Sequence, residues 1–212
     1  MNLDDVKQYE PSFLSFLNAE GHADAAHDVN HILRVVKAAT QLAIEEQAEL
    51  AVVIPAAWLH DCVSLPKNHP NRAHASKLAG GKAISFLESI EYPPVYFEGI
   101  HHAITAHSFS ANVAPRTLEA KIVQDADRLD ALGAVGVARC MQVSGALNRP
   151  LYSSDDPFCE TRSPNDAHYT IDHFYNKLFN ITDTLNTSAA RLEGRKREAF
   201  MRAFLTQLKE EI

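Results

Sequence analysis

The chain has 212 residues, and 46% of them are hydrophobic, which is enough to bury the core of a single folded domain. Its formal net charge of -7 argues against a protein that binds nucleic acid polymers, because phosphate contacts need a basic surface. The longest apolar run, 51–59, is too short to cross a membrane and contains Pro55.

Apolar residues recur at intervals of three to four positions along nearly the whole chain, so the sequence predicts an all-α fold. The first helix is expected over 4–20, and the second begins near Asp28, whose carboxylate can cap its first turn. A third helix carries 48–62, in which Pro55 either introduces a kink or marks a late start. Further helices are predicted over 73–90, 94–107, 117–145, 171–185 and 188–211.

Two segments lack the helical pattern. Residues 63–72 contain prolines and asparagines that are typical of turns, and they follow the third predicted helix directly. Residues 144–167 are rich in Pro, Ser, Asp and Asn, and a stretch of this length without regular structure is usually a functional cover or a mobile segment. We therefore expect a loop beside the end of the third helix and a long irregular segment before the last helices.

Four residues of metal-ligand type lie within otherwise apolar segments: His31, the adjacent pair His60 and Asp61, and Asp127. A carboxylate is costly to bury unless a cation compensates its charge. Two imidazoles and two carboxylates form a mixed set that suits Mn, Fe, Co, Ni or Zn better than Ca, and Mg is a further option. The sequence therefore predicts a bound divalent metal.

Each of these residues also has a simpler explanation when it is taken singly. His31 shares its helical stripe with Val35 and could be a core histidine. The side chains of His60 and Asp61 point about 100° apart on a helix, so one ion can bind both only if it lies between the two helix faces. Asp127 could be a carboxylate that complements a helix dipole. It is the combination of the four residues that favours a metal site.

The order His, His-Asp, Asp resembles that of the HD superfamily of metal-dependent phosphohydrolases, all-helical proteins named for the adjacent pair. Longer blocks are similar to one bacterial branch, the YedJ-like predicted hydrolases. These blocks, which together span most of the chain, are residues 27–35, 58–61, 106–110, 124–134, 172–178 and 197–201.

This resemblance implies one HD-type helical bundle over 1–212 with a metal site at its centre. Residues 22–145, approximately, would form the metal-binding core, and residues 146–212 would supply a loop and the C-terminal helices that pack on it. The resemblance assigns the metal ligands to His31, His60, Asp61 and Asp127.

Three further histidines, His101, His102 and His107, lie between the HD pair and Asp127. In relatives with two metals, additional histidines in this interval complete a second site. His102 and His107 are five positions apart, about 140° around a helix, so they can face one point only if the helix ends or bends before His107. We expect one metal per chain, with His102 and His107 as phosphate donors or as residues that orient the ligands.

Lys67 and Arg72 lie in the predicted loop that follows the HD pair. Their positive charges could hold the anionic oxygens of a phosphate, and the planar guanidinium of arginine matches phosphate geometry. They could equally be solvated loop charges. The predicted catalytic set is therefore Asp61, His102, His107, Lys67 and Arg72.

A divalent ion with open coordination positions lowers the pKa of bound water and polarises a phosphoryl oxygen. The sequence therefore predicts hydrolysis of a phosphoric ester or anhydride by metal-activated water. The HD resemblance implies a small phosphorylated substrate, most often a nucleotide. One alternative is a di-iron HD-type oxygenase, which would need both extra histidines as ligands. Another is a non-catalytic metal sensor that binds a nucleotide without turnover.

The cysteines predict the compartment. Cys62, Cys140 and Cys159 are odd in number and have no CxxC spacing, which favours a reducing environment over a disulfide framework. The first residues are acidic and polar, without the features of a secretory signal. We therefore expect a cytoplasmic protein whose partner is a small phosphorylated molecule, and neither a membrane nor a nucleic acid polymer.

Overall fold

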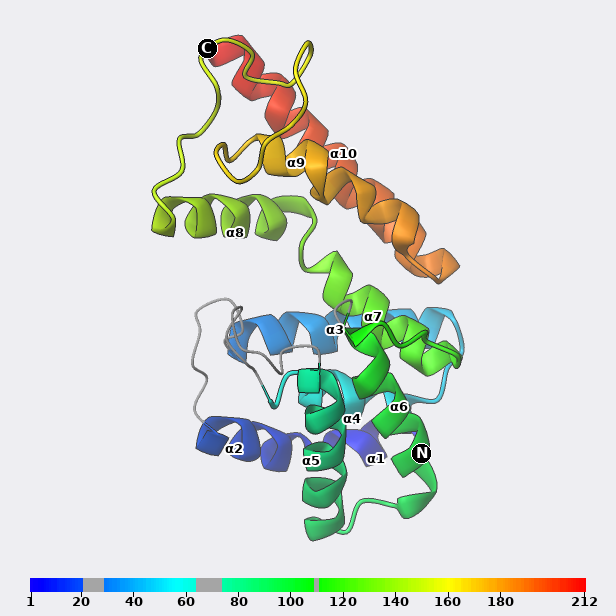
Figure 1. Cartoon of the computed structure of the whole chain (residues 1–212). Helices are drawn as coiled ribbons and strands as arrows, with labels where there is room; N and C mark the ends of the chain where they lie inside the picture. Colours follow the sequence, from blue (N-terminus) through cyan, green and yellow to red (C-terminus); the bar gives the residue numbers. More distant parts are fainter. Residues whose placement is uncertain (21–28, 64–73, 109–110) are drawn as a thin grey trace. The chain divides into compact units, whose positions relative to one another are not determined.

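The computed structural model describes all residues except 21–28, 64–73 and 109–110. The described residues contain helices and no strand, so the predicted all-α fold is confirmed. They form two compact units, 1–127 and 128–212 (Figure 1). Across these residues, each helix is either too short or too polar for a bilayer crossing.

The first unit contains α1 (Leu3–Lys7), α2 (Glu10–Glu20), α3 (Val29–Glu45), α4 (Leu50–Leu59), α5 (Ala75–Ser89), η2 (Pro94–Tyr96), α6 (Phe97–His107) and most of α7 (Leu118–Leu129). The second contains α8 (Gly133–Ala146), α9 (Asp172–Asn176), η4 (Leu178–Asn180), η5 (Thr182–Thr184) and α10 (Ser188–Glu211). The prediction of a single HD-type domain over 1–212 stays a prediction.

Helix α4 is the central element of the first unit. All of its residues from Ala51 to Leu59 are buried, because a helix that is apolar around its whole circumference is stable only inside a core. It contacts α1 and α2, and it packs against both α3 and α6 (Figure 1). Because α4 ends at Leu59, it delivers the next two residues, His60 and Asp61, to the interior of this unit.

Pro55 lies inside α4, and its missing N–H would leave the carbonyl of Ala51, four residues earlier, without its usual donor. The hydroxyl of Tyr92, which is buried, donates a hydrogen bond to this carbonyl at 2.7 Å. Of the two alternatives for Pro55, a kink or a late start, the late start is wrong, because α4 begins at Leu50. Tyr92 thus supplies the hydrogen bond that the proline cannot form.

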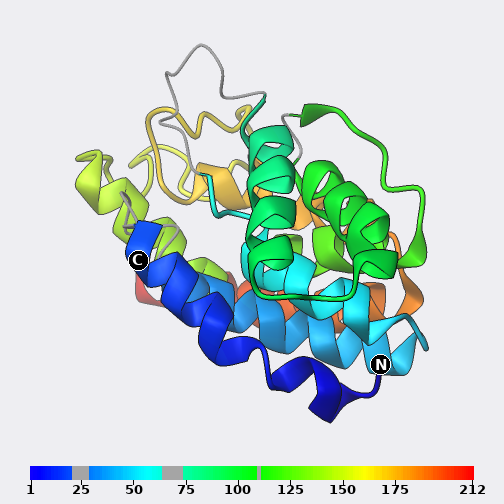
Figure 2. The same ribbon diagram turned by 90° about the horizontal axis from the view of Figure 1, so that it is seen from below.

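Helices α5 and α6 lie side by side, as Figure 2 shows. Gly80 on α5 permits this close approach, because an added Cβ would lie 3.0 Å from Cδ2 of His101 and 3.0 Å from Oγ1 of Thr105. Contacts this short are rare even in tightly packed protein interiors. The C-terminal half of α6 is therefore held closely against α5.

Some predicted helices are shorter than expected, and the reasons are local. The single helix predicted over 4–20 is divided, because the ring of Pro11 would clash with the carbonyl of Lys7, where α1 ends. The single helix predicted over 117–145 is also wrong. It is interrupted between α7 and α8, where Gly133 adopts a left-handed φ of 71°. The predicted helix 171–185 consists of the short elements α9, η4 and η5.

In the second unit, α8 and α10 pack together, and the segment between α8 and α9 is irregular (Figure 1). This segment is held by polar side chains of its own and by Asp172, the first residue of α9. The guanidinium of Arg162 binds both carboxylate oxygens of Asp172, at 2.5 and 2.7 Å. The carboxylate of Asp156 accepts hydrogen bonds from the backbone N–H groups of Glu160, Thr161 and Arg162. The irregular segment is thus built around internal hydrogen bonds.

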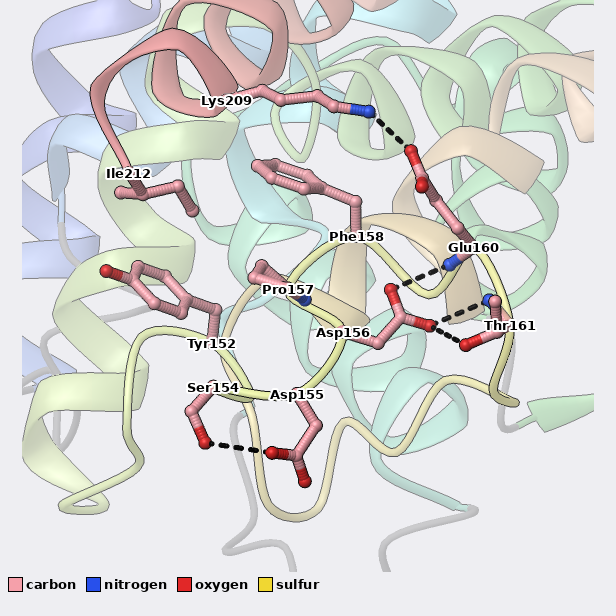
Figure 3. A pocket seen from close by; sticks show the side chains of 10 residues that line it. All are labelled: Tyr152, Ser154, Asp155, Asp156, Pro157, Phe158, Glu160, Thr161, Lys209 and Ile212. Atoms are coloured by element: carbon pink, nitrogen blue, oxygen red, sulfur yellow. Dashed lines mark hydrogen bonds and ion pairs between the residues drawn. The ribbon is translucent and has the colours of Figure 1, made fainter.

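A cavity of about 590 Å³ lies between this segment and the end of α10 (Figure 3). Charged groups on its wall have partners within the same unit. Lys209 forms an ion pair with Glu160. The carboxylate of Asp156 accepts hydrogen bonds from the backbone N–H groups of Glu160 and Thr161. The ion pair between Lys209 and Glu160 attaches the irregular segment to α10. The cavity is lined by Tyr152, Ser154, Asp155, Asp156, Pro157, Phe158, Glu160, Thr161, Lys209 and Ile212.

Candidate metal centre

Three buried histidines from three different helical regions meet in the first unit. His31 lies on α3, His60 directly follows α4, and His107 is the last residue of α6. Their rings are close together, with centroids 5.4 Å apart for His31 and His60 and 4.9 Å apart for His60 and His107. Because α3 and α6 both pack on α4, the packing of this unit brings the three imidazoles to one place.

His60 and His107 are anchored in the same way. Nδ1 of His60 donates to the carbonyl of Ala57 at 2.8 Å, and Nδ1 of His107 donates to the carbonyl of Ile104 at 2.6 Å. A carbonyl only accepts hydrogen bonds, so Nδ1 carries the proton in both rings. In each ring, Nε2 is therefore the atom that is directed at the cluster.

The two predicted carboxylate ligands face these imidazoles. Oδ1 of Asp127 lies 3.4 Å from Nε2 of His31 and 4.0 Å from Nε2 of His60. Oδ2 of Asp61 lies 3.9 Å from Nε2 of His31 and 3.6 Å from Nε2 of His60. The structure thus brings together all four residues that the sequence assigned to the metal.

His107 lies beside Asp61, on the other oxygen of the carboxylate. Its Nε2 is 3.4 Å from Oδ1 of Asp61, whereas Oδ2 of Asp61 faces His31 and His60. This position depends on the end of α6, because the chain turns to an extended conformation at Ser108. The sequence grouped His107 with His102, but only the structure shows that His107 adjoins Asp61, a predicted ligand.

His102 is placed differently. Its Nε2 accepts a hydrogen bond from the backbone N–H of Arg116 at 3.0 Å, and it belongs to neither of the two clusters of closely spaced metal-ligand atoms in the described residues. Its predicted role as a phosphate donor stays a prediction. Lys67 and Arg72, the other predicted phosphate contacts, lie outside the described residues.

Within the described part of the chain, the ligand atoms form two overlapping groups in which all atoms lie within 4.8 Å of one another, and either group could hold a metal ion: His31, His60 and Asp127, and His60, Asp61 and His107. Ligand atoms about 2.1 Å from a metal lie roughly 3.4 Å apart in a tetrahedral site. The four imidazole-to-carboxylate distances around His31 and His60 fall between 3.4 and 4.0 Å. In addition, Nε2 of His60 is fully buried and has no hydrogen-bond partner among the residues that the structure describes. A cation would compensate the cost of this buried nitrogen.

The pKa values of His60 and His107, which are anchored in the same way, are shifted in opposite directions. Burial lowers the pKa of His60 below its ordinary value of 6.5, although Asp61 opposes this effect, so its Nε2 carries a lone pair. Burial also disfavours the charged form of His107, but the hydrogen bond and charge of Asp61 outweigh it and raise the pKa of His107. His60 is therefore suited to be a neutral ligand, and His107 is suited to be a cationic donor.

The carboxylates form the open side of the site. The histidine side chains are 0–7% exposed, whereas the side chains of Asp61 and Asp127 are 19% and 31% exposed. Burial disfavours ionised Asp127, but the hydrogen bond from His31 and the nearby histidines hold the pKa of this carboxyl below its usual value. Water and a substrate could thus approach a bound metal from the side of these two carboxylates.

Comparison with known proteins connects this site with a family. The HD domain family matches residues 28–132, which contain all four predicted ligands. The uncharacterized protein YpgQ of Bacillus subtilis is 32% identical over 200 residues, covering 89% of this chain and 85% of YpgQ.

Similar solved structures point to the same family. An HD-superfamily hydrolase from Bacillus thuringiensis is 32% identical with a TM-score of 0.72, and the match covers 95% of this chain and 97% of that one. Bacillus subtilis YpgQ in complex with ADP is 29% identical with a TM-score of 0.69, covering 99% of this chain and 96% of YpgQ. The sequence similarity, the all-α fold and the clustered His and Asp residues agree. The chain belongs to the HD superfamily of metal-dependent phosphohydrolases.

Proposed function

We propose that this protein hydrolyses a phosphoric ester or anhydride bond in a small nucleotide, and that it uses one divalent ion held by His31, His60, Asp61 and Asp127. The observation that carries the proposal is the convergence of these side chains, with distances of 3.4 to 4.0 Å between the imidazole and carboxylate atoms. The ADP bound to the relative YpgQ supports a nucleotide as the substrate class.

A divalent ion bound by these residues would supply Lewis acidity and would make coordinated water more acidic. The protein's own groups would then orient the reactants. Asp61 is placed to accept a proton from water, since its carboxylate lies at the site and is partly exposed. His107, in its cationic form, would hold Asp61 through Oδ1 and leave Oδ2 for the metal.

We expect one metal per chain, because the two-metal alternative needs both His102 and His107 as ligands. Nε2 of His107 does lie close to the ligand atoms of His60 and Asp61, at 3.4 Å from Oδ1 of Asp61. His102, however, the other histidine that the oxygenase alternative requires, is directed at the backbone of Arg116. This contact favours hydrolysis over two-iron oxygen chemistry.

The test is the release of orthophosphate and pyrophosphate from a nucleotide library in the presence of Mn, Co, Ni, Fe or Mg. Wild type is expected to release one of these products, and its identity locates the phosphorus that is attacked. His60→Ala is expected to lose this activity, whereas His168→Ala, which changes an exposed histidine of the second unit, is expected to retain it.

Two outcomes would overturn the proposal. The first is the absence of product from wild type with every metal and nucleotide, because tight nucleotide binding without turnover would favour the sensor alternative. The second is equal activity of His60→Ala and wild type under metal-saturating conditions, because a buried ligand cannot be dispensable for chemistry that depends on the metal.

A further inference from the structure

Three successive carbonyls in the last turn of α6 accept hydrogen bonds from side chains. The carbonyl of Ile104 accepts from Nδ1 of His107 at 2.6 Å. The carbonyl of Thr105 accepts from the hydroxyl of Ser76 at 3.0 Å, and the carbonyl of Ala106 accepts from Nε2 of Gln124 at 2.8 Å. The last carbonyls of a helix lack donors from their own helix, so these side chains complete the end of α6.

The two donors from outside α6 are buried residues on neighbouring helices. Ser76 lies on α5 and is 4% exposed, and Gln124 lies on α7 and is 5% exposed. Gln124 is also three positions before the ligand Asp127, almost one helical turn. The end of α6 is therefore fixed between the helix at its side and the helix that carries Asp127.

We propose that Gln124 and Ser76 are positioning residues that act through His107. They fix the last turn of α6, this turn sets the place of Nε2 of His107, and Nε2 in turn holds Oδ1 of Asp61 at 3.4 Å. The inference rests on the proposed function in one respect, the role of Asp61 as a metal ligand. Partners that orient a ligand commonly change metal affinity or activity by about 10–100-fold when they are removed.

The loss of either donor would leave a polar atom without its partner. Gln124→Leu keeps much of the side-chain volume but deprives the carbonyl of Ala106 of its side-chain donor, and Ser76→Ala does the same for Thr105. A buried carbonyl without a donor favours conformations in which it reaches water, and here this requires the last turn of α6 to open. His107 would then leave the position at which it contacts Asp61.

The matched control is Tyr92→Phe. This change also removes one hydrogen bond from a buried side chain to a backbone carbonyl in the same unit. The carbonyl that it affects is that of Ala51, nine positions before His60 and thus roughly 13 Å away along the helix. The control therefore separates a general loss of stability from a local effect on the metal centre.

The experiment measures Mn²⁺ affinity by calorimetric titration in the absence of nucleotide, and stability by urea unfolding. Gln124→Leu is expected to bind Mn²⁺ about 10-fold more weakly than wild type, Ser76→Ala to change affinity in the same direction, and Tyr92→Phe to bind as wild type does. Equal Mn²⁺ affinity of Gln124→Leu and Tyr92→Phe would overturn the proposal. If Gln124→Leu does not fold, Ser76→Ala, which removes a single oxygen atom, decides the question by the same comparison.

A double-mutant cycle tests whether the effect passes through His107. In the His107→Ala background, Gln124→Leu is expected to cause no further loss of Mn²⁺ affinity. An additive loss would show that Gln124 acts by another route and would contradict the inference. The outcome is separate from that of the proposed function, because a wild-type protein that binds Mn²⁺ but releases no phosphate would refute hydrolysis and still allow this comparison.

Discussion

The hydrogen bond between Tyr92 and α4 provides a quantitative test of how the first unit holds its central helix. Tyr92→Phe removes the hydroxyl that donates to the carbonyl of Ala51 at 2.7 Å, and it leaves the ring in place. The edge-to-face contact with Tyr9, at 4.8 Å between centroids, is therefore retained. Because Pro55 cannot supply an N–H to this carbonyl, the substitution leaves it unsatisfied, at a cost of about 1–3 kcal/mol.

Trp58 makes this cost measurable in the relevant unit. It is the only tryptophan of the chain, it lies on α4, and its side chain is buried. Its fluorescence during urea unfolding therefore reports on the unit that contains the metal centre. We expect Tyr92→Phe to lower the free energy of unfolding by about 2 kcal/mol. A change below about 0.5 kcal/mol, the range of an ordinary surface substitution, would refute the reasoning.

Measuring Tyr92→Phe in a Pro55→Ala variant tests whether the proline is the reason for the loss of stability. Pro55→Ala restores a backbone N–H that can donate to the carbonyl of Ala51, so Tyr92→Phe should cost about 1 kcal/mol less in this background. The same cost in both backgrounds would show that the hydroxyl does not compensate for the proline. Hydrogen exchange at the amides of α4 would then locate the true source of the loss.

Three further predictions concern other parts of the molecule. Burial would raise the pKa of Asp172, but Arg162 holds it below its ordinary value of 3.8. The stability that Asp172 contributes is therefore present above that value and lost as pH falls through the lowered pKa. Asp172→Asn should lower the free energy of urea unfolding at pH 7, with a difference from wild type that shrinks below about pH 4; a constant difference would contradict this. Gly133→Ala should cost about 1–2 kcal/mol in the same assay, because φ is 71° and a Cβ would lie 3.2 Å from Cγ of Arg197. Elemental analysis of protein purified without oxygen should find one transition metal per chain, and two would favour the oxygenase alternative.

Much of the cluster of His and Asp side chains could be predicted from the sequence, because its signals are local. The apolar run of α4 directly precedes His60 and Asp61, and the helical stripe of α3 directs His31 inward. The assignment of these residues as ligands also depended on the HD resemblance. The all-α fold followed from the helical periodicity.

The contacts that complete the site could not be predicted in the same way. The contact between His107 and Asp61 depends on where α6 ends, and the hydrogen bond from Gln124 depends on which helix packs against that end. The carbonyl of Ala51 accepts its hydrogen bond from Tyr92, 41 positions away. Such pairings are decided by tertiary packing, which overrides local propensity and leaves no periodic signal in a single sequence.

The binding of one cation by His31, His60, Asp61 and Asp127 is tested most directly by anomalous scattering from crystals grown with Mn²⁺. We predict one strong peak in the first unit, within about 2.3 Å of Nε2 of both histidines and of an oxygen of each carboxylate. A Mn²⁺ peak elsewhere in the chain, or full occupancy of this position in His60→Ala, would contradict the proposed metal centre.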